Sequence, residues 1–188
     1  MGTALLVGLI AALAIGGLIV FNLLVKRRQM ALNGWADIDV QLKRRADLIP
    51  QLVNTVKGYA AHERALFEDI AEKRSAAMSA GDDPRARGAA ESALSRPVSR
   101  MIAVAEDYPE LKANEVFLDL QRQLAETEDK IEMARRFYNG AVRELNTLIH
   151  SVPSNIVAGL AGVSERAYFE IDEAADRAAP KVTLDEKR

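Results

Sequence analysis

Few residues in this sequence have the types and the spacing that chemistry requires. The chain contains no cysteine, which rules out disulfides, zinc–thiolate sites and cysteine nucleophiles. Di-metal helical bundles carry Glu-x-x-His, but Tyr59 precedes His62 and Thr147 precedes His150 at that spacing. The sequence also lacks His-Glu-x-x-His, a glycine-rich phosphate loop and a Gly-x-Ser-x-Gly elbow. We therefore expect no enzyme activity, no bound metal and no cofactor.

One basic cluster, Lys43-Arg44-Arg45, suits contact with anionic lipid or with a partner protein. Arg45 also falls on the apolar stripe of the helix that is expected there. Two interpretations are open. Arg45 extends to solvent or pairs with an acid on a neighbouring helix, or else Ala46 takes the inward position and Arg45 lies at the edge.

Acidic residues gather near position 128, where they alternate with basic residues. A solvated or helix-pairing face explains this pattern better than a catalytic site does. The acids are Glu126, Glu128, Asp129 and Glu132, and the bases are Arg122, Lys130, Arg135 and Arg136.

A long apolar stripe over residues 114–152 must position these charges. Its members recur at alternating steps of three and four, which predicts one seam of a long α-helix packed on partner helices. Asn114 suits the N-cap, and Pro153 ends the pattern. The stripe consists of Phe117, Leu120, Leu124, Thr127, Ile131, Ala134, Tyr138, Ala141, Leu145, Leu148 and Val152.

Three further amphipathic segments, residues 29–57, 61–79 and 85–105, supply the partner helices. Pro50 predicts a kink in the first segment and Pro97 a bend in the third, while Gly58 suits a stop. The residues expected to face inward are Trp35, Ile38, Leu42, Ile49, Leu52, Val56, Tyr59, Leu66, Phe67, Ile70, Ala77, Met78, Ala90, Leu94, Val98, Met101 and Ile102.

Residues 3–25 carry no charge, and as a helix they would span about 34 Å, enough for a hydrocarbon core of about 30 Å. A signal peptide fits less well, because no basic residue precedes the apolar run and no small-x-small site follows it. Lys26-Arg27-Arg28 follow at once. By the positive-inside rule, the N-terminus lies outside and residues 29–188 lie in the cytoplasm of a bacterial cell.

Small residues recur every fourth position within this membrane segment. Such a strip lets two helix backbones approach closely, which favours self-association. The alternative is that small residues are simply common in membrane helices. The strip consists of Ala4, Gly8, Ala12 and Gly16.

These patterns predict an all-α fold, in which an N-terminal transmembrane helix precedes an up-and-down antiparallel four-helix bundle with long helices. We expect three parts: a membrane anchor with a basic flank at 1–28, the bundle at 29–152, and a short helix with a tail at 153–188. Tyr168 and Phe169 are expected to dock that tail on the bundle, while Asp185 to Arg188 stay loose.

Two long blocks of this sequence resemble the LemA family of bacterial membrane proteins. The first block runs from Asp39 to Pro50, including Asp47, and continues with Val56-Lys57-Gly58-Tyr59 and His62-Glu63. The second runs from Tyr108-Pro109 to Asn114 and continues through Leu120-Gln121, Leu124, Glu128-Asp129, Ile131, Ala134-Arg135, Tyr138-Asn139 and Pro153-Ser154-Asn155. A weaker third match is Tyr168-Phe169. The resemblance implies a membrane-tethered helical bundle and carries over no catalytic residue.

Two classes of function remain after these exclusions. The bundle is a non-enzymatic scaffold that self-associates or docks partner proteins at the membrane, or it is an accessory subunit of another envelope protein, such as a membrane protease. A homo-oligomer is expected. A net charge of −2 does not favour binding to nucleic acid.

Overall fold

The computed structural model describes residues 1–171, and no strand occurs within them. The expectation of an all-α fold is therefore confirmed for this part of the chain. Asp185 to Arg188, which we expected to be loose, lie outside the described residues. The helices are α1 (Gly2–Lys57), α2 (Arg64–Ser79), α3 (Pro84–Ala105), α4 (Pro109–Lys112), α5 (Glu115–His150) and α6 (Ser154–Leu160).

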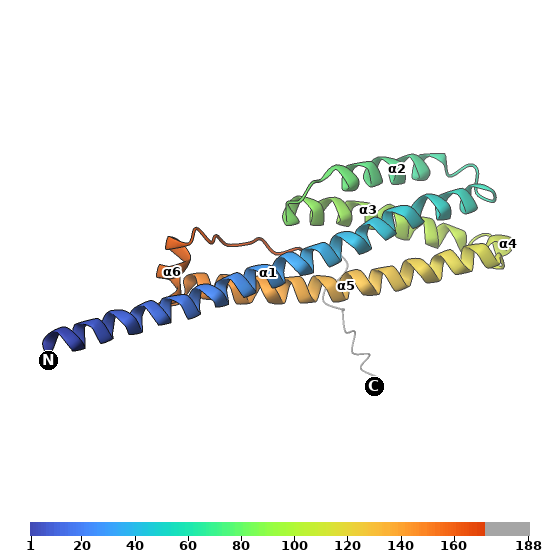
Figure 1. Ribbon diagram of the computed structural model, residues 1–188. Helices are drawn as coiled ribbons and strands as arrows, with labels where there is room; N and C mark the ends of the chain where they lie inside the picture. Colours follow the sequence, from blue (N-terminus) through green and yellow to red (C-terminus); the bar gives the residue numbers. More distant parts are fainter. Residues whose placement is uncertain (172–188) are drawn as a thin grey trace, which may run out of the picture.

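Helices α1 and α5 form the axis of the molecule and lie side by side (Figure 1). They run antiparallel, because Arg27 contacts Glu144 near one end whereas Arg45 contacts Glu128 further along. The two helices lie close together at Gly34, where a Cβ would lie 3.1 Å from the Cα of Tyr138. A larger residue at position 34 would push the two long helices apart.

Local signals explain where the helices begin and end. Asn114 caps α5, since its side-chain oxygen accepts a hydrogen bond from the backbone N–H of Phe117 at 3.0 Å. Asp83 caps α3 in the same way, and Pro84 takes the first helical position. Helix α1 continues as α-helix through Pro50. It ends at Lys57, with Gly58 as its C-cap.

Helices α2 and α3 pack on each other as a hairpin that covers only the later part of α1 (Figure 1). We call this end of the α1–α5 pair, residues 48–56 and 117–124, the distal end. Its core draws residues from α1, α2, α3, α4 and α5, among them Leu52, Ile70, Leu94 and Phe117. The hairpin helices are much shorter than α1 and α5, so the partner helices do not run the full length of the pair.

The other end of the pair, residues 24–42 and 131–145, we call the proximal end. Here an extended segment, residues 163–171, takes the place that helices occupy distally, and we call it the strap. Phe169 of the strap is fully buried and packs with Ile38, Ile131 and Tyr138. A third, small cluster joins α6 to both long helices through Leu24, Leu145 and Ala158.

Most residues expected to face inward are buried, with a few exceptions. Val152 lies beyond the end of α5 and is 80% exposed, because the helix ends at His150, before the last stripe position. Met78 is 55% exposed, since Ala77 takes the inward position beside it. Tyr59 follows the end of α1 and is exposed, and Tyr168 is exposed while its neighbour Phe169 docks.

Candidate functional site: membrane segment and buried charge network

The N-terminal part of α1 is long and apolar enough to cross a membrane, and no residue of its most apolar 18-residue window is buried by the described chain. It projects beyond α5 and α6 (Figure 1). Its large side chains, such as Leu9, Leu13 and Leu18, are more than half exposed. An isolated helix with apolar residues on every side is unstable in water, so this segment requires an apolar environment.

The expected strip of small residues lies open on this segment. Ala4, Gly8, Ala12 and Gly16 are all exposed. A Cβ added at Gly8 or Gly16 would meet nothing within 4 Å. The strip is therefore available to a partner helix.

The three basic residues after the apolar segment have different surroundings. Arg27 forms an ion pair with Glu144 and so ties α1 to α5 just beyond the apolar segment. Lys26 and Arg28 are exposed.

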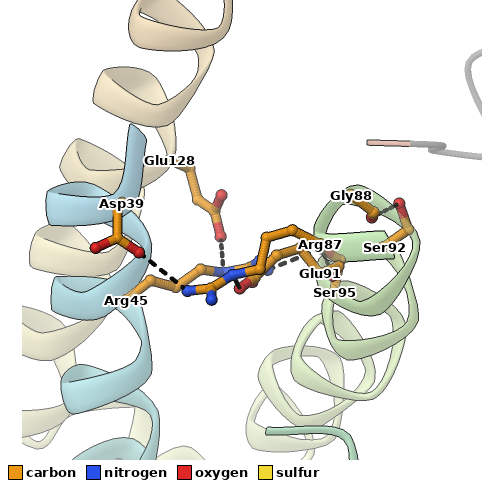
Figure 2. A network of polar contacts seen from close by, with 8 residues as sticks. All are labelled: Asp39, Arg45, Arg87, Gly88, Glu91, Ser92, Ser95 and Glu128. Carbon is orange, nitrogen blue, oxygen red and sulfur yellow. Dashed lines mark hydrogen bonds and ion pairs between the residues drawn. The ribbon is translucent and has the colours of Figure 1, made fainter. Parts of the chain in front are cut away.

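Arg45 is at the centre of a buried charge network (Figure 2). Its side chain is 2% exposed, and that of Glu91 on α3 is 3% exposed. Arg45 Nη1 donates to Glu91 Oε2 at 3.0 Å, Nη2 donates to Ser95 Oγ at 2.8 Å, and Nε pairs with Glu128 Oε1 at 2.8 Å. One guanidinium therefore joins α1, α3 and α5. Of the two interpretations of Arg45, the one with an acidic partner on a neighbouring helix is confirmed, and Ala46 is buried beside it.

A second arginine extends the network. Arg87 Nε lies 3.4 Å from Glu91 Oε1, and Arg87 Nη2 lies 3.4 Å from Asp39 Oδ1 on α1 (Figure 2). Burial raises the pKa of Glu91 above its ordinary range, and the charges of Arg45 and Arg87 oppose that rise only in part. Glu91 is thus paired with one arginine on α1 and one on its own helix.

The position of this network between two hydrophobic clusters relates it to the register of the helices. Arg45 lies between Leu42 and Leu48 on α1, which belong to different hydrophobic clusters. Glu128 likewise lies between the two clusters on α5, and its ion pair with Arg45 agrees with the helix-pairing alternative for this acidic residue. An apolar residue at position 45 would make the α1 seam continuous. A buried charge there fixes the register of α1 against α3 and α5, because a shift by one turn would leave it unpaired.

Apart from Arg45, the charged residues of the Asp39–Pro50 motif block on α1 are at the surface. Lys43, Arg44 and Asp47 are exposed, so Arg45 alone of the basic cluster turns inward. Lys43 and Arg44 remain available to lipid or a partner. Pro50 is half-buried within α1.

Two motif blocks far apart in sequence meet at the tip of the distal end. The Tyr108 hydroxyl lies 2.7 Å from His62 Nε2, and Asn114 Nδ2 donates to the Tyr59 hydroxyl at 3.1 Å. Pro109 begins α4 between them. These contacts hold the α1–α2 turn to the residues on either side of α4, which is a structural role for the motif residues.

Two asparagines of α5 hold the strap. Asn139 accepts from the backbone N–H of Phe169 and donates to its carbonyl, both at 2.9 Å. Asn146 does the same to Arg166, at 3.1 and 3.0 Å. On the other side the strap touches α3 at Gly88, where a Cβ would lie 2.2 Å from the Glu170 carbonyl oxygen. A residue larger than glycine does not fit at position 88 unless the strap moves.

Neither His62 nor His150 belongs to a group of three side chains that could bind a metal ion in residues 1–171. His62 contacts Tyr108, and His150 Nε2 lies 2.7 Å from Glu165 Oε1. Within residues 1–171, no three His, Asp or Glu side chains are grouped so as to hold a metal ion.

Sequence reasoning missed Glu91, Arg87 and Ser95 of the network and both strap asparagines. One signal was present: Arg87, Glu91 and Ser95 recur at steps of four, which places them on one face of α3. Asn139 and Asn146 are seven residues apart and so share a face of α5. Nothing in the sequence alone pairs either face with its partner.

The model of the LemA family matches residues 34–184, which include the network, both turn motifs and the strap. The chain belongs to the LemA family. The part that matches begins well inside α1, after the apolar segment.

Individual relatives are distant. The chain is 25% identical over 166 residues to magnetosome proteins MamQ 1 and MamQ 2 of Paramagnetospirillum magneticum, an overlap that covers 75% of this chain. It is 24% identical over 152 residues to protein LemA of Metamycoplasma hominis, covering 81% of this chain and 69% of that protein. The chain spans 61% of the length of the two magnetosome relatives.

Proposed function

We propose that this protein is a membrane-anchored, non-enzymatic scaffold. In this proposal the first part of α1 crosses the membrane, and α1, α2, α3 and α5 act as an up-and-down bundle that self-associates or docks partner proteins at the membrane surface. One observation carries the proposal. The apolar segment, which the described chain leaves uncovered, continues without interruption into the helix that forms the core of the domain. The anchor and the domain are therefore one mechanical element.

The motif residues support a structural role. Arg45 and Glu91 form an ion pair between helices, and contacts of Tyr108 with His62 and of Asn114 with Tyr59 join the α1–α2 turn to both ends of α4. The word magnetosome in the names of MamQ 1 and MamQ 2 describes those two proteins, and we do not extend it to this chain.

The proposed orientation places the N-terminus outside and the bundle in the cytoplasm, because the positive charges follow the apolar segment. The test labels single cysteines in intact cells with a membrane-impermeant thiol reagent. Met133 on α5 is 62% exposed and Gly2 is also exposed, so both sites tolerate cysteine. We expect Gly2→Cys to be labelled and Met133→Cys to be protected until the cells are permeabilised. The reverse pattern would invert the orientation.

Self-association is the proposed working state. The open strip of Ala4, Gly8, Ala12 and Gly16 allows close helix approach, and confinement to a membrane raises the effective concentration for weak contacts. The test is mass photometry in mild detergent, which compares the full-length protein with a Gly8→Leu/Gly16→Leu variant and with a fragment starting at Gln29. We expect the full-length protein to be oligomeric and the two variants to be weaker or monomeric.

A Leu5→Ala variant serves as the control, since Leu5 is exposed but lies off the strip. A monomeric full-length protein would exclude the scaffold and leave the accessory subunit as the better reading. Oligomers that persist in the double glycine variant would locate self-association in the bundle instead.

A further inference from the structure

Helix α6 and its flanking turns have an unusual composition for a solvent-facing region. Fourteen consecutive residues, 151–164, carry no charge. Outside the N-terminal apolar segment, the described chain is otherwise densely charged. This uncharged stretch therefore stands out in the domain.

The burial pattern of α6 is the reverse of a normal surface helix. Its small residues Ser154 and Ala158 face inward, whereas Ile156 and Leu160, one turn apart, are 61% and 86% exposed. Val152 in the preceding turn is 80% exposed. A soluble protein normally buries its large apolar residues and exposes its small polar ones. Three large apolar side chains in one uncharged region mark a surface that something else covers.

The location of α6 indicates what covers it. Its inner face packs against Leu24 of α1, with Val20 also in contact. Both residues lie in the last turns of the apolar segment, before Lys26. At about 1.5 Å per residue, residues 3–23 span roughly 30 Å, which is the thickness of the hydrocarbon core. Helix α6 thus lies beside α1 at the level where the membrane would end.

Polar groups begin immediately behind this surface. His150 and Glu165, at the two ends of the uncharged stretch, lie within 2.7 Å of each other, and Arg27 pairs with Glu144 nearby on α5. An apolar face bordered by charged residues is the arrangement of elements that lie in a membrane interface.

We propose that Val152, Ile156 and Leu160 form a second membrane contact, in which α6 lies in the interface of the lipid bilayer on the same side as the bundle. The proposal rests on the membrane anchoring proposed above. A single membrane helix can rotate about its axis, and a second contact removes that freedom. The α1–α5 pair then leaves the membrane in one fixed orientation, with the same flank always turned toward the bilayer.

The experiment uses the natural absence of cysteine. Full-length protein with one cysteine, either Ile156→Cys or Leu160→Cys, carries a nitroxide spin label in liposomes of phosphatidylcholine and phosphatidylglycerol. Power saturation compares collisions with oxygen, which concentrates in the bilayer, with collisions with a water-soluble nickel chelate. Leu18→Cys in the apolar segment is the control for immersion, and Met133→Cys on α5 is the control for water, since both side chains are more than half exposed. Circular dichroism confirms that each variant keeps its helices.

We expect labels at positions 156 and 160 to show an oxygen-to-nickel ratio several-fold above that at 133 and closer to that at 18. If position 18 is immersed but 156 and 160 match 133, the second contact is refuted while the anchor stands. If position 18 also matches 133, the anchor itself fails, and the second contact fails with it. Labels at 156 and 160 that are immobilised and shielded from both reagents would show that protein covers α6, which also overturns the proposal.

Discussion

The two ends of the α1–α5 pair are built from the same two helices but are covered in different ways. At the distal end, α2, α3 and α4 supply aliphatic side chains such as Ile70 and Leu94. At the proximal end, the strap and α6 supply the cover, and asparagine amides hold the strap by its backbone. The comparison shows that a long helical pair does not need helical partners throughout. Side-chain amides can satisfy an extended backbone that runs along a helix.

The charge network separates these two regimes. Arg45 and Glu128 lie between the two hydrophobic clusters, and Glu91 reaches them from the helix hairpin. On α1 and α5, the distal core cluster thus ends where the network begins, and α3 continues past it to touch the strap at Gly88. This arrangement predicts that substitutions at the distal end, in the network and at the strap destabilise different portions of the molecule.

The largest effect is expected at the distal end. Leu124 is 4% exposed, and truncating such a leucine to alanine typically costs about 2–5 kcal/mol. Leu124→Asp should cost more, since it also buries a carboxylate. We expect the whole domain to lose its cooperative thermal transition, monitored by circular dichroism. Arg122→Ala is the control and should be nearly silent, because Arg122 is exposed and pairs with Asp119 on its own helix. A Leu124→Asp variant that melts within a few degrees of the parent would show that α5 does not face a core.

The next largest effect is expected in the network. Glu91→Ala removes the more deeply buried of the two carboxylates that pair with Arg45 and leaves Glu128 in place. Breaking a buried ion pair typically costs about 3–5 kcal/mol, and the remaining Glu128 pair places this variant toward the lower end of that range. The double variant Arg45→Met/Glu91→Leu should recover most of that loss, because an apolar pair of similar size needs no compensating charge. Urea unfolding of the three proteins measures both effects. A double variant as unstable as Glu91→Ala would mean that the charges contribute stability beyond pairing with each other.

A smaller, local effect is expected at the strap. Asn139→Ala removes two hydrogen bonds to Phe169, each worth about 0.5–1.5 kcal/mol net. We expect limited proteolysis to cleave residues 163–171 sooner while the distal core keeps its hydrogen-exchange protection. Asn155→Ala is the matched control, since Asn155 is exposed on α6. Faster exchange in α2 and α3 of the Asn139→Ala variant would contradict the independence of the two ends.

The smallest effect is a dependence on pH. Burial raises the folded-state pKa of Glu91, so folding favours the protonated carboxyl. The contribution of this titration to the free energy of unfolding is therefore fully present below the ordinary pKa of 4.5, and it is lost as the pH rises through the raised pKa. Glu91→Gln removes this titration. We expect the free energy of unfolding of the parent, relative to the glutamine variant, to fall as the pH rises from below 4.5 toward neutrality. If the stability of the parent relative to Glu91→Gln instead rises over that pH range, the pKa of Glu91 is lowered in the folded state and not raised.

The sequence predicted the long seams well because their period is local. Steps of three and four along residues 117–145 identify the buried face of α5, and an uncharged run identifies the apolar segment, with no knowledge of any partner. The cap at Asn114 is likewise a signal between neighbours in the chain.

The network and the strap could not be predicted, because their signals are not local. Arg45 on its stripe indicated that an acid was needed, but Glu91 lies 46 residues away in an alanine-rich helix where an acid normally faces water. Asn139 lies off the apolar stripe and has the pattern of a surface amide. Only the folded chain shows which side chain or backbone group each of these polar residues contacts.

The central claim is that α1 is one helix whose first part is buried by a bilayer. Hydrogen–deuterium exchange of the full-length protein in lipid nanodiscs tests it most directly. The described chain buries no residue of the most apolar window, so slow exchange there requires cover beyond the packing of residues 1–171, which a membrane would supply. We expect slow exchange that runs unbroken from the apolar segment through Lys26 to the distal core. Rapid exchange in the apolar segment, or a fast-exchanging break near Lys26, would contradict the account.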